Sequence, residues 1–552
     1  MKKNIKSYLK EEIKNNLIKI YKIKDIPEIN FEVPRFTKFG DISCNIALSL
    51  SKILNKSPIE IAEEIVKNIR IDKELISKVD MAGAGFINFF FSEKYLSGLL
   101  IEIEENENFA KSDEGKGKKV NIEFVSANPV GPLNIVNARA AAVGNSLSNL
   151  LENIGYNVTK EYYINDVGNQ IEIFGKSISL RYEELLGKKI DFPQDFYAGE
   201  YIKDIARRII NEEGDKYISL GEDERIKLFK EKGLEWMIGI QRKSLEDYGV
   251  KFDVWFKEID LHISGQVKRA IEVFEKNQYT EKKEDALWFK STLFGDDKDR
   301  VLQKNDGTYT YLAADIAYHK NKYDRGFEQI IDIWGPDHHG YIPRMRGAVQ
   351  AFGRDVATFN VLIAQQVNLI KDGKPFKMSK REGSFVTMNE LVSEVGADAA
   401  KYFFIRRSLN SHLDFDIDQA KKQSNENPVY YVQYAHARIC NIIEFAKSGE
   451  IKLKSVKESK LELLKESEEI ELMRKISVFQ DTLIFSGISY QPHLVCKYLE
   501  ELASSFHSFY TKHRVITDDK DLTYSRLVLC NAVKIVLKKG LDILGVSAPD
   551  RM

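Results

Sequence analysis

Cysteine is scarce in this chain, and a long apolar run is absent. Only four cysteines occur among 552 residues, none in a Cys-x-x-Cys pair: Cys44, Cys440, Cys496 and Cys530. That spacing argues against a disulfide framework and a cysteine zinc site, and it favours a reducing compartment. No 18 consecutive residues are apolar, so we expect no membrane partner and a soluble, cytoplasmic protein.

An excess of either charge is also missing. Lys and Arg number 82 against 83 for Asp and Glu, which leaves a formal net charge of -1. A protein that coats nucleic acid is usually far more basic, so DNA binding is not expected and any RNA contact must come from local patches. The length of 552 residues exceeds what one hydrophobic core organises and indicates three or four domains.

Residues 1–115 are predicted to form a small α+β unit. A four-residue spacing typical of an amphipathic helix is kept by Ile5, Leu9, Ile13 and Leu17. Residues 82–91 are typical of a glycine turn that leads into a strand. The acidic, glycine-containing residues 104–119 have the composition of a linker, so we place a domain boundary near residue 115.

Residues 116–424 alternate strand and helix patterns in the way that a parallel α/β sheet requires. A β-rich run at 120–125 is followed by a Pro/Gly turn and by a helix whose apolar stripe ends before Gly155. Residues of about 175–290 are rich in Lys and Glu at helical spacing, which predicts a helical insertion into the sheet domain. Further strands are predicted within 158–164, 330–334 and 359–363, and a tight hairpin turn at Asp372-Gly373.

Residues 425–552 keep a helical pattern without a convincing strand, which predicts a C-terminal bundle. One face of its first helix carries Tyr430, Tyr434 and Arg438. The opposite face carries an apolar stripe typical of a core, made of Val432, Ala435 and Ile439. Rings beside a cation suit unstacked RNA bases and phosphates, but a tyrosine stripe is also common in plain packing, so both alternatives stay open.

The first helix of the sheet domain begins at two asparagines, Asn134 and Asn137. Anions bind at helix N-termini beyond the carboxyl ends of parallel strands, so both amides are candidate donors to phosphate oxygens. The alternative is that they only cap the helix. Farther along, Lys377-Met-Ser-Lys-Arg-Glu-Gly383 places two ammonium groups in a basic loop, which suits the charge of a departing pyrophosphate.

Five longer segments, spread over the whole chain, carry a family resemblance. They are Glu123-Phe-Val-Ser-Ala-Asn-Pro129, Glu161-Tyr-Tyr-Ile-Asn-Asp-Val-Gly-Asn-Gln170, Trp334-Gly-Pro-Asp-His-His-Gly-Tyr341, His412-Leu-Asp-Phe-Asp416 and Leu544-Gly-Val-Ser-Ala-Pro-Asp-Arg-Met552. Together with residues 134–137 and 377–380, they resemble the arginyl-tRNA synthetases, which are class I aminoacyl-tRNA synthetases. One departure stands out, because Asn134, Val136 and Asn137 replace the usual His-x-Gly-His of that class.

The resemblance implies a multidomain α/β protein with a Rossmann-like catalytic sheet domain. An N-terminal α+β domain that contacts tRNA would precede it, and an all-α, anticodon-binding bundle would follow it. The implied reaction is the ATP-dependent ligation of L-arginine to tRNA(Arg) through an arginyl-adenylate, with Mg²⁺ accompanying ATP and no tightly bound metal. The alternatives are a non-catalytic tRNA-binding paralogue that has lost the phosphate histidines, and a nucleotidyltransferase for a different small acid.

The implied arginine pocket has a physical rationale. Arginine carries a permanently charged guanidinium with five donors, so its pocket needs carboxylates and planar acceptors. Tyr311 and Asp315 are four residues apart on one helix, with Asp315 as the expected guanidinium partner. The resemblance adds Glu123, Asn128 and His338 to this pocket. The cluster of Asp337, His338 and His339 is not expected to bind a metal, since no third well-spaced ligand is near.

The resemblance also implies residues for the other substrates. The catalytic residues would be Lys377, Lys380, Asn134 and Asn137. ATP would contact Gly131, Asn134, Asn137, Gly335, Asp337, Met378, Ser379 and Lys380. The tRNA would contact Tyr430, Tyr434 and Arg438.

Overall fold

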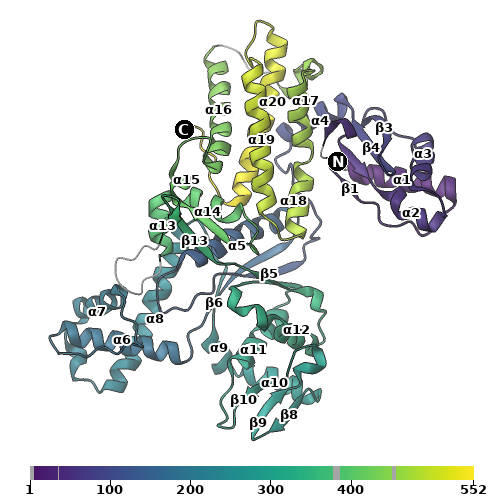
Figure 1. Ribbon diagram of the computed structural model, residues 1–552. Helices are drawn as coiled ribbons and strands as arrows, with labels where there is room; N and C mark the ends of the chain where they lie inside the picture. Colours follow the sequence, from purple (N-terminus) through teal and green to yellow (C-terminus); the bar gives the residue numbers. More distant parts are fainter. Residues whose placement is uncertain (1–4, 35, 377–385, 450–454) are drawn as a thin grey trace.

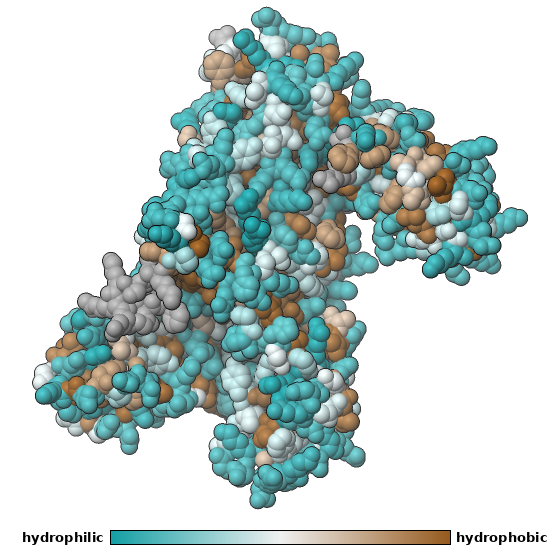
Figure 2. Space-filling view, in the orientation of Figure 1, coloured by the Kyte–Doolittle hydropathy of each residue, from teal (hydrophilic) through white to brown (hydrophobic). Residues whose placement is uncertain are grey.

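The computed structural model describes residues 5–34, 36–376, 386–449 and 455–552. A central sheet domain carries two lower lobes, a helical bundle stands above it, and a small N-terminal module lies beside the bundle (Figure 1). None of the described helices is long and apolar enough to span a membrane. On the face drawn in Figure 2, hydrophilic side chains predominate, and the hydrophobic ones form small, scattered groups.

The N-terminal module is a four-stranded antiparallel sheet covered by helices. Its strand order is β1-β2-β4-β3, with β1 Phe31–Glu32, β2 Ile42–Cys44, β3 Ile76–Ala82 and β4 Phe86–Phe91. The helices are α1 Ile5–Tyr21, α2 Ile46–Leu54, α3 Pro58–Asn68 and α4 Glu93–Glu105. The predicted apolar stripe of α1 is confirmed, because each of its four members is buried: Ile5, Leu9, Ile13 and Leu17.

One carboxylate ties this module to the bundle. Asp41 accepts a hydrogen bond of 2.6 Å from the backbone N–H of Phe91, and it lies 2.7 Å from Nε of Arg474 in α17 (Ser467–Ser477). The preceding Gly40 has a φ of +91°, and a Cβ there would lie only 2.8 Å from the carbonyl oxygen of Phe89. The turn therefore requires glycine to bring Asp41 into place.

The central sheet has five parallel strands in the order β12-β11-β5-β6-β7. Their bounds are β5 Lys119–Glu123, β6 Asn157–Ile164, β7 Val254–Lys257, β11 Gln329–Trp334 and β12 Phe359–Ile363. The four strands predicted from the sequence are confirmed as β5, β6, β11 and β12. Because the strands are parallel, their carboxyl ends share one edge, where sheets of this type bind ligands.

The predicted helical insertion of about residues 175–290 is too long at its C-terminal end. One lobe is helical, with α6 Asn169–Leu185, α7 Glu200–Glu213 and α8 Glu222–Asp247 around a core that includes Phe174, Tyr182 and Phe229. Residues 254–257 then form β7, the edge strand of the central sheet, which pairs with β6. The local sequence pattern did not reveal this strand, because it is stabilised by tertiary packing: Trp255 packs on Tyr162 of β6, with ring centroids 4.3 Å apart.

The second lobe combines helices with a small antiparallel sheet. Its strands are β8 Thr280–Lys283, β9 Ala286–Phe289 and β10 Arg300–Gln303. Its helices, which lead back to the central sheet, are α9 Glu258–Ile263, α10 Gln266–Lys276, α11 Tyr311–Asp324 and α12 Ile342–Ala351.

A third small sheet, of order β14-β13-β15, follows the central one. The elements here are β13 Val367–Lys371, β14 Lys374–Pro375, β15 Leu413–Asp416, α13 Met388–Val395, α14 Ala397–Ile405 and α15 Ile417–Lys421. The predicted hairpin turn is confirmed, since Asp372 and Gly373 both have positive φ, 52° and 69°. The lysine motif falls within residues 377–385, outside the described residues.

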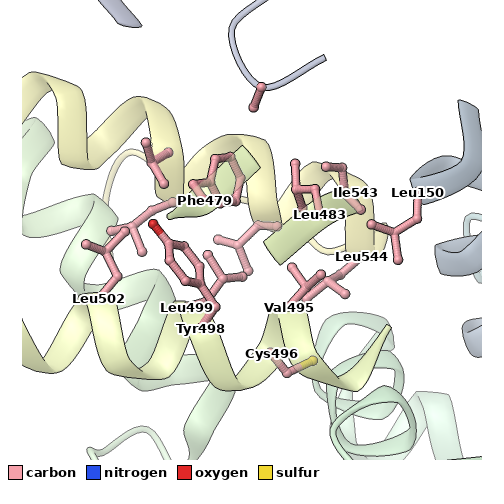
Figure 3. Close-up of a cluster of buried hydrophobic side chains, with 14 of the residues drawn as sticks. Leu150, Phe479, Leu483, Val495, Cys496, Tyr498, Leu499, Leu502, Ile543 and Leu544 are labelled. Carbon is pink, nitrogen blue, oxygen red and sulfur yellow. The ribbon is translucent and has the colours of Figure 1, made fainter. Parts of the chain in front are cut away.

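Helix α5 (Ile135–Asn153) joins the sheet to the bundle. It packs closely on the end of β5, because a Cβ at Gly144 would lie 2.4 Å from the Phe124 ring. Its other end contacts α18 and α20, and Figure 3 shows Leu150 of α5 beside Leu544. The bundle helices are α16 Pro428–Ser448, α17, α18 Phe479–Ile488, α19 His493–Lys512 and α20 Lys520–Leu544. As predicted, the described residues of the bundle contain no strand.

Candidate active site

The carboxyl ends of β5 and β11 meet at a buried ionic network. Glu123 and Asp332 are register partners on these adjacent parallel strands. Lys322 of α11 lies between them, with Nζ 2.6 Å from Glu123 and 2.8 Å from Asp332, and its side chain is fully buried. Ser126 donates a 2.9 Å hydrogen bond to the other oxygen of Glu123. Glu123, predicted to contact arginine, therefore already has a partner on each oxygen.

The first turn of α5 is closed by a reciprocal cap between its two asparagines. Oδ1 of Asn134 accepts from the backbone N–H groups of Val136 and Asn137, at 2.9 and 3.0 Å, and Oδ1 of Asn137 accepts from the N–H of Asn134 at 3.0 Å. The two asparagines thus form a capping box, which by itself does not decide between capping alone and phosphate binding. Because both oxygens face backbone donors, both amide nitrogens face away from the helix, and no described residue accepts from them. Capping and phosphate binding are compatible here.

The residues that follow the lysine motif are fastened to this helix start. The backbone N–H of Met388 donates to the carbonyl of Leu133 at 2.8 Å, and Thr387 forms an isolated bridge with Asn134. Thr387 also caps α13 through the N–H of Glu390. The predicted residues Lys377, Met378, Ser379 and Lys380 themselves lie outside the described residues.

Asp315 of α11 is a buried carboxylate without a Lys or Arg partner among the described residues. It is only 9% exposed, and the Tyr341 hydroxyl donates to it at 2.7 Å. Burial raises its pKa from 3.8 to about 7, while the nearby charge of Glu258 adds to the rise and the hydrogen bond from Tyr341 opposes it. No Lys or Arg of the described chain forms an ion pair with Asp315. Such a group is prepared for a positively charged ligand.

Tyr311 and Asp315 lie together, as their spacing predicted. They are one helical turn apart on α11, and the negative charge of Asp315 is the largest cause of the raised pKa of Tyr311. Half of Tyr311 remains exposed, at 52%, so it stands at the mouth of the site rather than in a core. Together they place a buried carboxylate and a half-exposed phenol on the first turns of α11.

Two further residues near Asp315 were not predicted, Glu258 and Tyr163. Glu258 opens α9 just beyond the end of β7 and is 5% exposed, and burial raises its pKa. Its described partners are neutral or weakly basic: Asn165, whose amide nitrogen lies 3.2 Å away once oriented toward its acceptors, and His262 at 3.5 Å. The buried hydroxyl of Tyr163 faces Glu258, whose charge helps to raise the pKa of the tyrosine after burial, and it has no other hydrogen-bond partner among the described residues. The only feature that could have suggested these two residues is their position near the carboxyl ends of strands.

The glycine turns predicted to receive ATP flank the same edge of the sheet. Gly131 lies in the turn after β5, where its carbonyl accepts a 2.8 Å hydrogen bond from Gln241. Gly335 follows β11 and starts a 3₁₀ helix, Pro336–Tyr341. Asp337 and His338 lie in that helix as exposed neighbours, 3.3 Å apart. Asn128, predicted for arginine, is exposed and donates to Gln170 at 2.7 Å.

The predicted tRNA residues form a continuous aromatic and cationic face on α16, in the bundle and not at the sheet edge. Tyr430 and Tyr434 stack with centroids 5.9 Å apart at 12°. Arg438 donates to the Tyr434 hydroxyl at 2.6 Å, and its guanidinium lies 4.8 Å from the ring centroid of Tyr510 in α19. All three predicted residues are partly exposed, whereas the opposite face is buried as predicted: Val432, Ala435 and Ile439.

Comparisons with known proteins cover the whole chain. Family models match for the arginyl tRNA synthetase N-terminal domain over residues 7–91, the class I (R) tRNA synthetase catalytic domain over 100–441 and the DALR anticodon binding domain over 432–552. The arginine–tRNA ligases of Citrifermentans bemidjiense and Bacillus subtilis are 46% and 45% identical, and the alignments cover 96% and 99% of both chains. A Campylobacter jejuni arginyl-tRNA synthetase structure matches with a TM-score of 0.77 at 34% identity, covering 84% of this chain and 100% of that one. The chain belongs to the arginyl-tRNA synthetases, within class I of the aminoacyl-tRNA synthetases.

Proposed function

We propose that Asp315 and Glu258 are the carboxylates with which this chain recognises arginine. The chain catalyses the ATP-dependent ligation of arginine to tRNA, the activity of its family. The observation that supports these two residues is their burial without a Lys or Arg partner in the described chain. Leaving charge unpaired in a folded protein is costly, so the pocket is stable in its ionised form only with a cationic ligand. A guanidinium can donate to both carboxylates at once.

Tyr311 and Tyr341 then complete the recognition of the side chain. The hydroxyl of Tyr341 orients Asp315, and the half-exposed ring of Tyr311 closes the mouth of the pocket. Lysine would reach the same carboxylates with a compact ammonium group, which cannot make the planar, forked contacts of a guanidinium. The pocket should therefore select arginine over lysine, because only a guanidinium can donate to the carboxylates of Asp315 and Glu258 from different edges of one planar group.

The reaction needs positioning and charge stabilisation rather than a protein nucleophile. An oxygen of the arginine carboxylate attacks the α-phosphorus of ATP in line, and the bond to pyrophosphate breaks. The adenylate carbonyl is then attacked by a hydroxyl of the terminal ribose of tRNA, which releases AMP. We assign Asn134 and Asn137 as neutral donors to the phosphates, and Lys377 and Lys380 as the cations that meet the departing pyrophosphate. Met378 and Ser379, Gly131, Gly335 and Asp337 would line the nucleotide.

Mg²⁺ fits this site as a companion of ATP. Among the described residues, the one grouping of three His, Cys, Asp or Glu ligand atoms within 4.8 Å is His436, Cys440 and Asp550, which lies in the bundle and not at the ATP end. Mg²⁺ commonly keeps several waters and binds phosphate oxygens with one or two carboxylates. Asp337, exposed beside Gly335, is the carboxylate at the ATP end that would meet it. When bound, the ion would offset charge on the phosphates.

The tRNA would be read at both ends of the molecule. We propose boundaries of 1–115 for the tRNA-contacting N-terminal domain, 116–424 for the catalytic domain and 425–552 for the anticodon-binding bundle. Stacked rings flanked by Arg438 give unstacked bases a π-face and phosphates a cation, which supports a role of the α16 face in anticodon binding. The four free cysteines favour the cytoplasm as the place of this reaction.

The test is arginine-dependent exchange of pyrophosphate into ATP by the purified chain, with and without tRNA(Arg), followed by charging of the tRNA. We expect exchange and charged product with arginine, and neither with lysine. Glu258→Gln and Asp315→Asn should each raise the KM for arginine and leave the KM for ATP unchanged. A chain that retains tRNA affinity but shows no exchange with any amino acid would be the non-catalytic paralogue instead.

A further inference from the structure

The turn after β5 contains two consecutive residues in the left-handed region of backbone space. Val125 has a φ of 70° and Ser126 a φ of 39°. A β-branched residue in this region is a rare outlier, because its side chain crowds the backbone. Such strain persists only where the surroundings over-determine the conformation, and it gathers at functional sites. Neither residue belongs to the contacts assigned above to arginine or ATP.

Hydrogen bonds hold the turn from the side of β6 and α8. The hydroxyl of Ser126 accepts from the backbone N–H of Tyr163 at 3.1 Å. The buried hydroxyl of Tyr162 accepts from the N–H of Ala127 at 3.1 Å and donates to Gln241 at 2.8 Å. The amide nitrogen of Gln241 in turn donates to the carbonyls of Asn128 and Gly131, at 3.1 and 2.8 Å. The backbone of the whole turn is thus fastened to neighbouring elements.

An ionic support lies behind these hydrogen bonds. Ser126 donates its own hydroxyl proton to Glu123 at 2.9 Å, and the other oxygen of Glu123 is held at 2.6 Å by Lys322. Lys322 is fully buried, and Asp332 holds it on the second side at 2.8 Å. His319 completes the chain of contacts, since its Nε2 lies 2.8 Å from Asp332. Each polar group in this row is oriented by the next, which makes the position of the Glu123 carboxylate well defined.

We propose that Lys322, Glu123 and Ser126 form a clamp that holds the strained Val125-Ser126 turn and thereby positions Asn128 and the start of α5 for the reaction. These three are positioning residues. The inference gives Glu123 a role one step behind the substrates, in place of the direct arginine contact expected from the family resemblance. It rests on the proposed function and deepens it, because the turn carries Asn128 and leads into α5, which are two parts of the proposed site.

Ser126→Ala is the first variant, since it removes the link between the turn and the clamp but leaves the buried ion pairs intact. A hydrogen bond to a charged acceptor is strong, so we expect the rate of arginine activation to fall by about tenfold or more, with the KM for arginine changed less than threefold. Ser148→Ala is the matched control. Ser148 is a buried serine of α5 that donates to the carbonyl of Gly144 at 2.8 Å, and its loss should leave the rate unchanged.

Val125→Gly is the second variant, and it separates clamping from other roles. Glycine adopts a positive φ without strain, so a turn that contains it no longer needs the clamp. In the Ser126→Ala background, Val125→Gly should restore most of the lost activation rate, whereas on its own it should leave the rate close to that of the parent. A residue with a purely structural or substrate-contacting role would not be rescued by relief of backbone strain at its neighbour.

Two results would overturn the clamp. The first is full activity of Ser126→Ala. The second is a slow but folded Ser126→Ala protein, with parental Tm, that Val125→Gly does not rescue. The parent protein keeps this test distinct from that of the proposed function: if the parent shows no arginine-dependent exchange, the proposed function fails, and if the parent is active while rescue fails, only the clamp fails.

Discussion

Replacing Asp315 with Asn is expected to weaken arginine binding strongly and at the same time to stabilise the ligand-free protein against unfolding. Asn has nearly the same volume and keeps an oxygen for the hydroxyl of Tyr341, which donates to Asp315 at 2.7 Å. What it removes is the negative charge. Loss of one partner from a buried, hydrogen-bonded charge pair costs about 2–5 kcal/mol. The KM for arginine should therefore rise by roughly thirtyfold to several thousandfold.

The stability effect follows from the pKa of Asp315. Burial raises that pKa from 3.8 to about 7, so the folded protein holds this proton more tightly than the unfolded chain. The stabilisation is complete below about pH 4 and is lost as the pH rises through about 7. At about 1.36 kcal/mol per pKa unit, ionisation of Asp315 in the free protein costs up to roughly 4 kcal/mol of unfolding free energy. Asn cannot ionise, so the variant should be more stable than the parent at pH 8 and equal to it near pH 4.

Two measurements check both effects. The KM for arginine is obtained from ATP–pyrophosphate exchange between pH 6 and 8.5, and Tm is obtained at pH 4.5 and 8. In the parent, arginine binding should weaken as the pH falls below about 7, because Asp315 becomes protonated, and the variant should lose this dependence. The control is Asp324→Asn on the same helix, where the carboxylate is exposed and pairs with Lys320 at 2.7 Å. An unchanged KM in Asp315→Asn, or a Tm gain of equal size at both pH values, would refute the reasoning.

Three further outcomes are expected. Glu258→Gln should raise the KM for arginine by about ten- to a hundredfold, and a double-mutant cycle with Asp315→Asn should show coupling, because both carboxylates hold one guanidinium. Asn134→Ala should slow activation by about ten- to a thousandfold and cost about 1 kcal/mol of stability, whereas Asn134→Ser should recover only the stability; equal rates in all three proteins would leave Asn134 as a cap alone. Arg438→Ala should raise the KM for tRNA by about five- to a hundredfold without effect on arginine, while Arg551→Ala, which breaks an exposed ion pair with Glu444, serves as its control.

Two of the predicted strands, β5 and β11, lie in the middle of the sheet and are buried almost throughout. Ile330–Trp334 is apolar except for Asp332, because the sheet is covered on each side, and that pattern is visible in the sequence. Strand β7 was not predicted, because it has only four residues and lies at the sheet edge between helices rich in charged residues. Its assignment depends on contacts of Trp255 with Tyr162 that no local pattern records. An edge strand of this kind is decided by tertiary packing.

In the proposed arginine pocket, too, some residues could be predicted from local sequence and others only from the assembled fold. Tyr311 and Asp315 could be predicted together because one helix turn sets their neighbourhood, whatever surrounds it. Glu258 and Tyr163 come from the ends of two other strands, and only the sheet brings them to Asp315. Glu258 also lies in a segment with further acids and a histidine, where nothing local distinguishes a buried carboxylate from a solvated one. The burial that raises the pKa of each acid is a property of the assembled edge.

The asparagines at the start of α5 show why a cap need not exclude catalysis. An amide has an acceptor and two donors, so Oδ1 can satisfy backbone N–H groups of the first turn while Nδ2 stays available to a phosphate oxygen. The capping has a consequence, however: the N–H groups of Val136 and Asn137 are already occupied by Asn134 and cannot themselves bind an anion. Neutral amide donors also stabilise growing charge less than an imidazolium would. We therefore expect the positive charge to come from Lys377 and Lys380, which precede Thr387, the residue bridged to Asn134, by seven to ten positions. Loss of Lys377 or Lys380 should therefore cost more of the activation rate than loss of either asparagine.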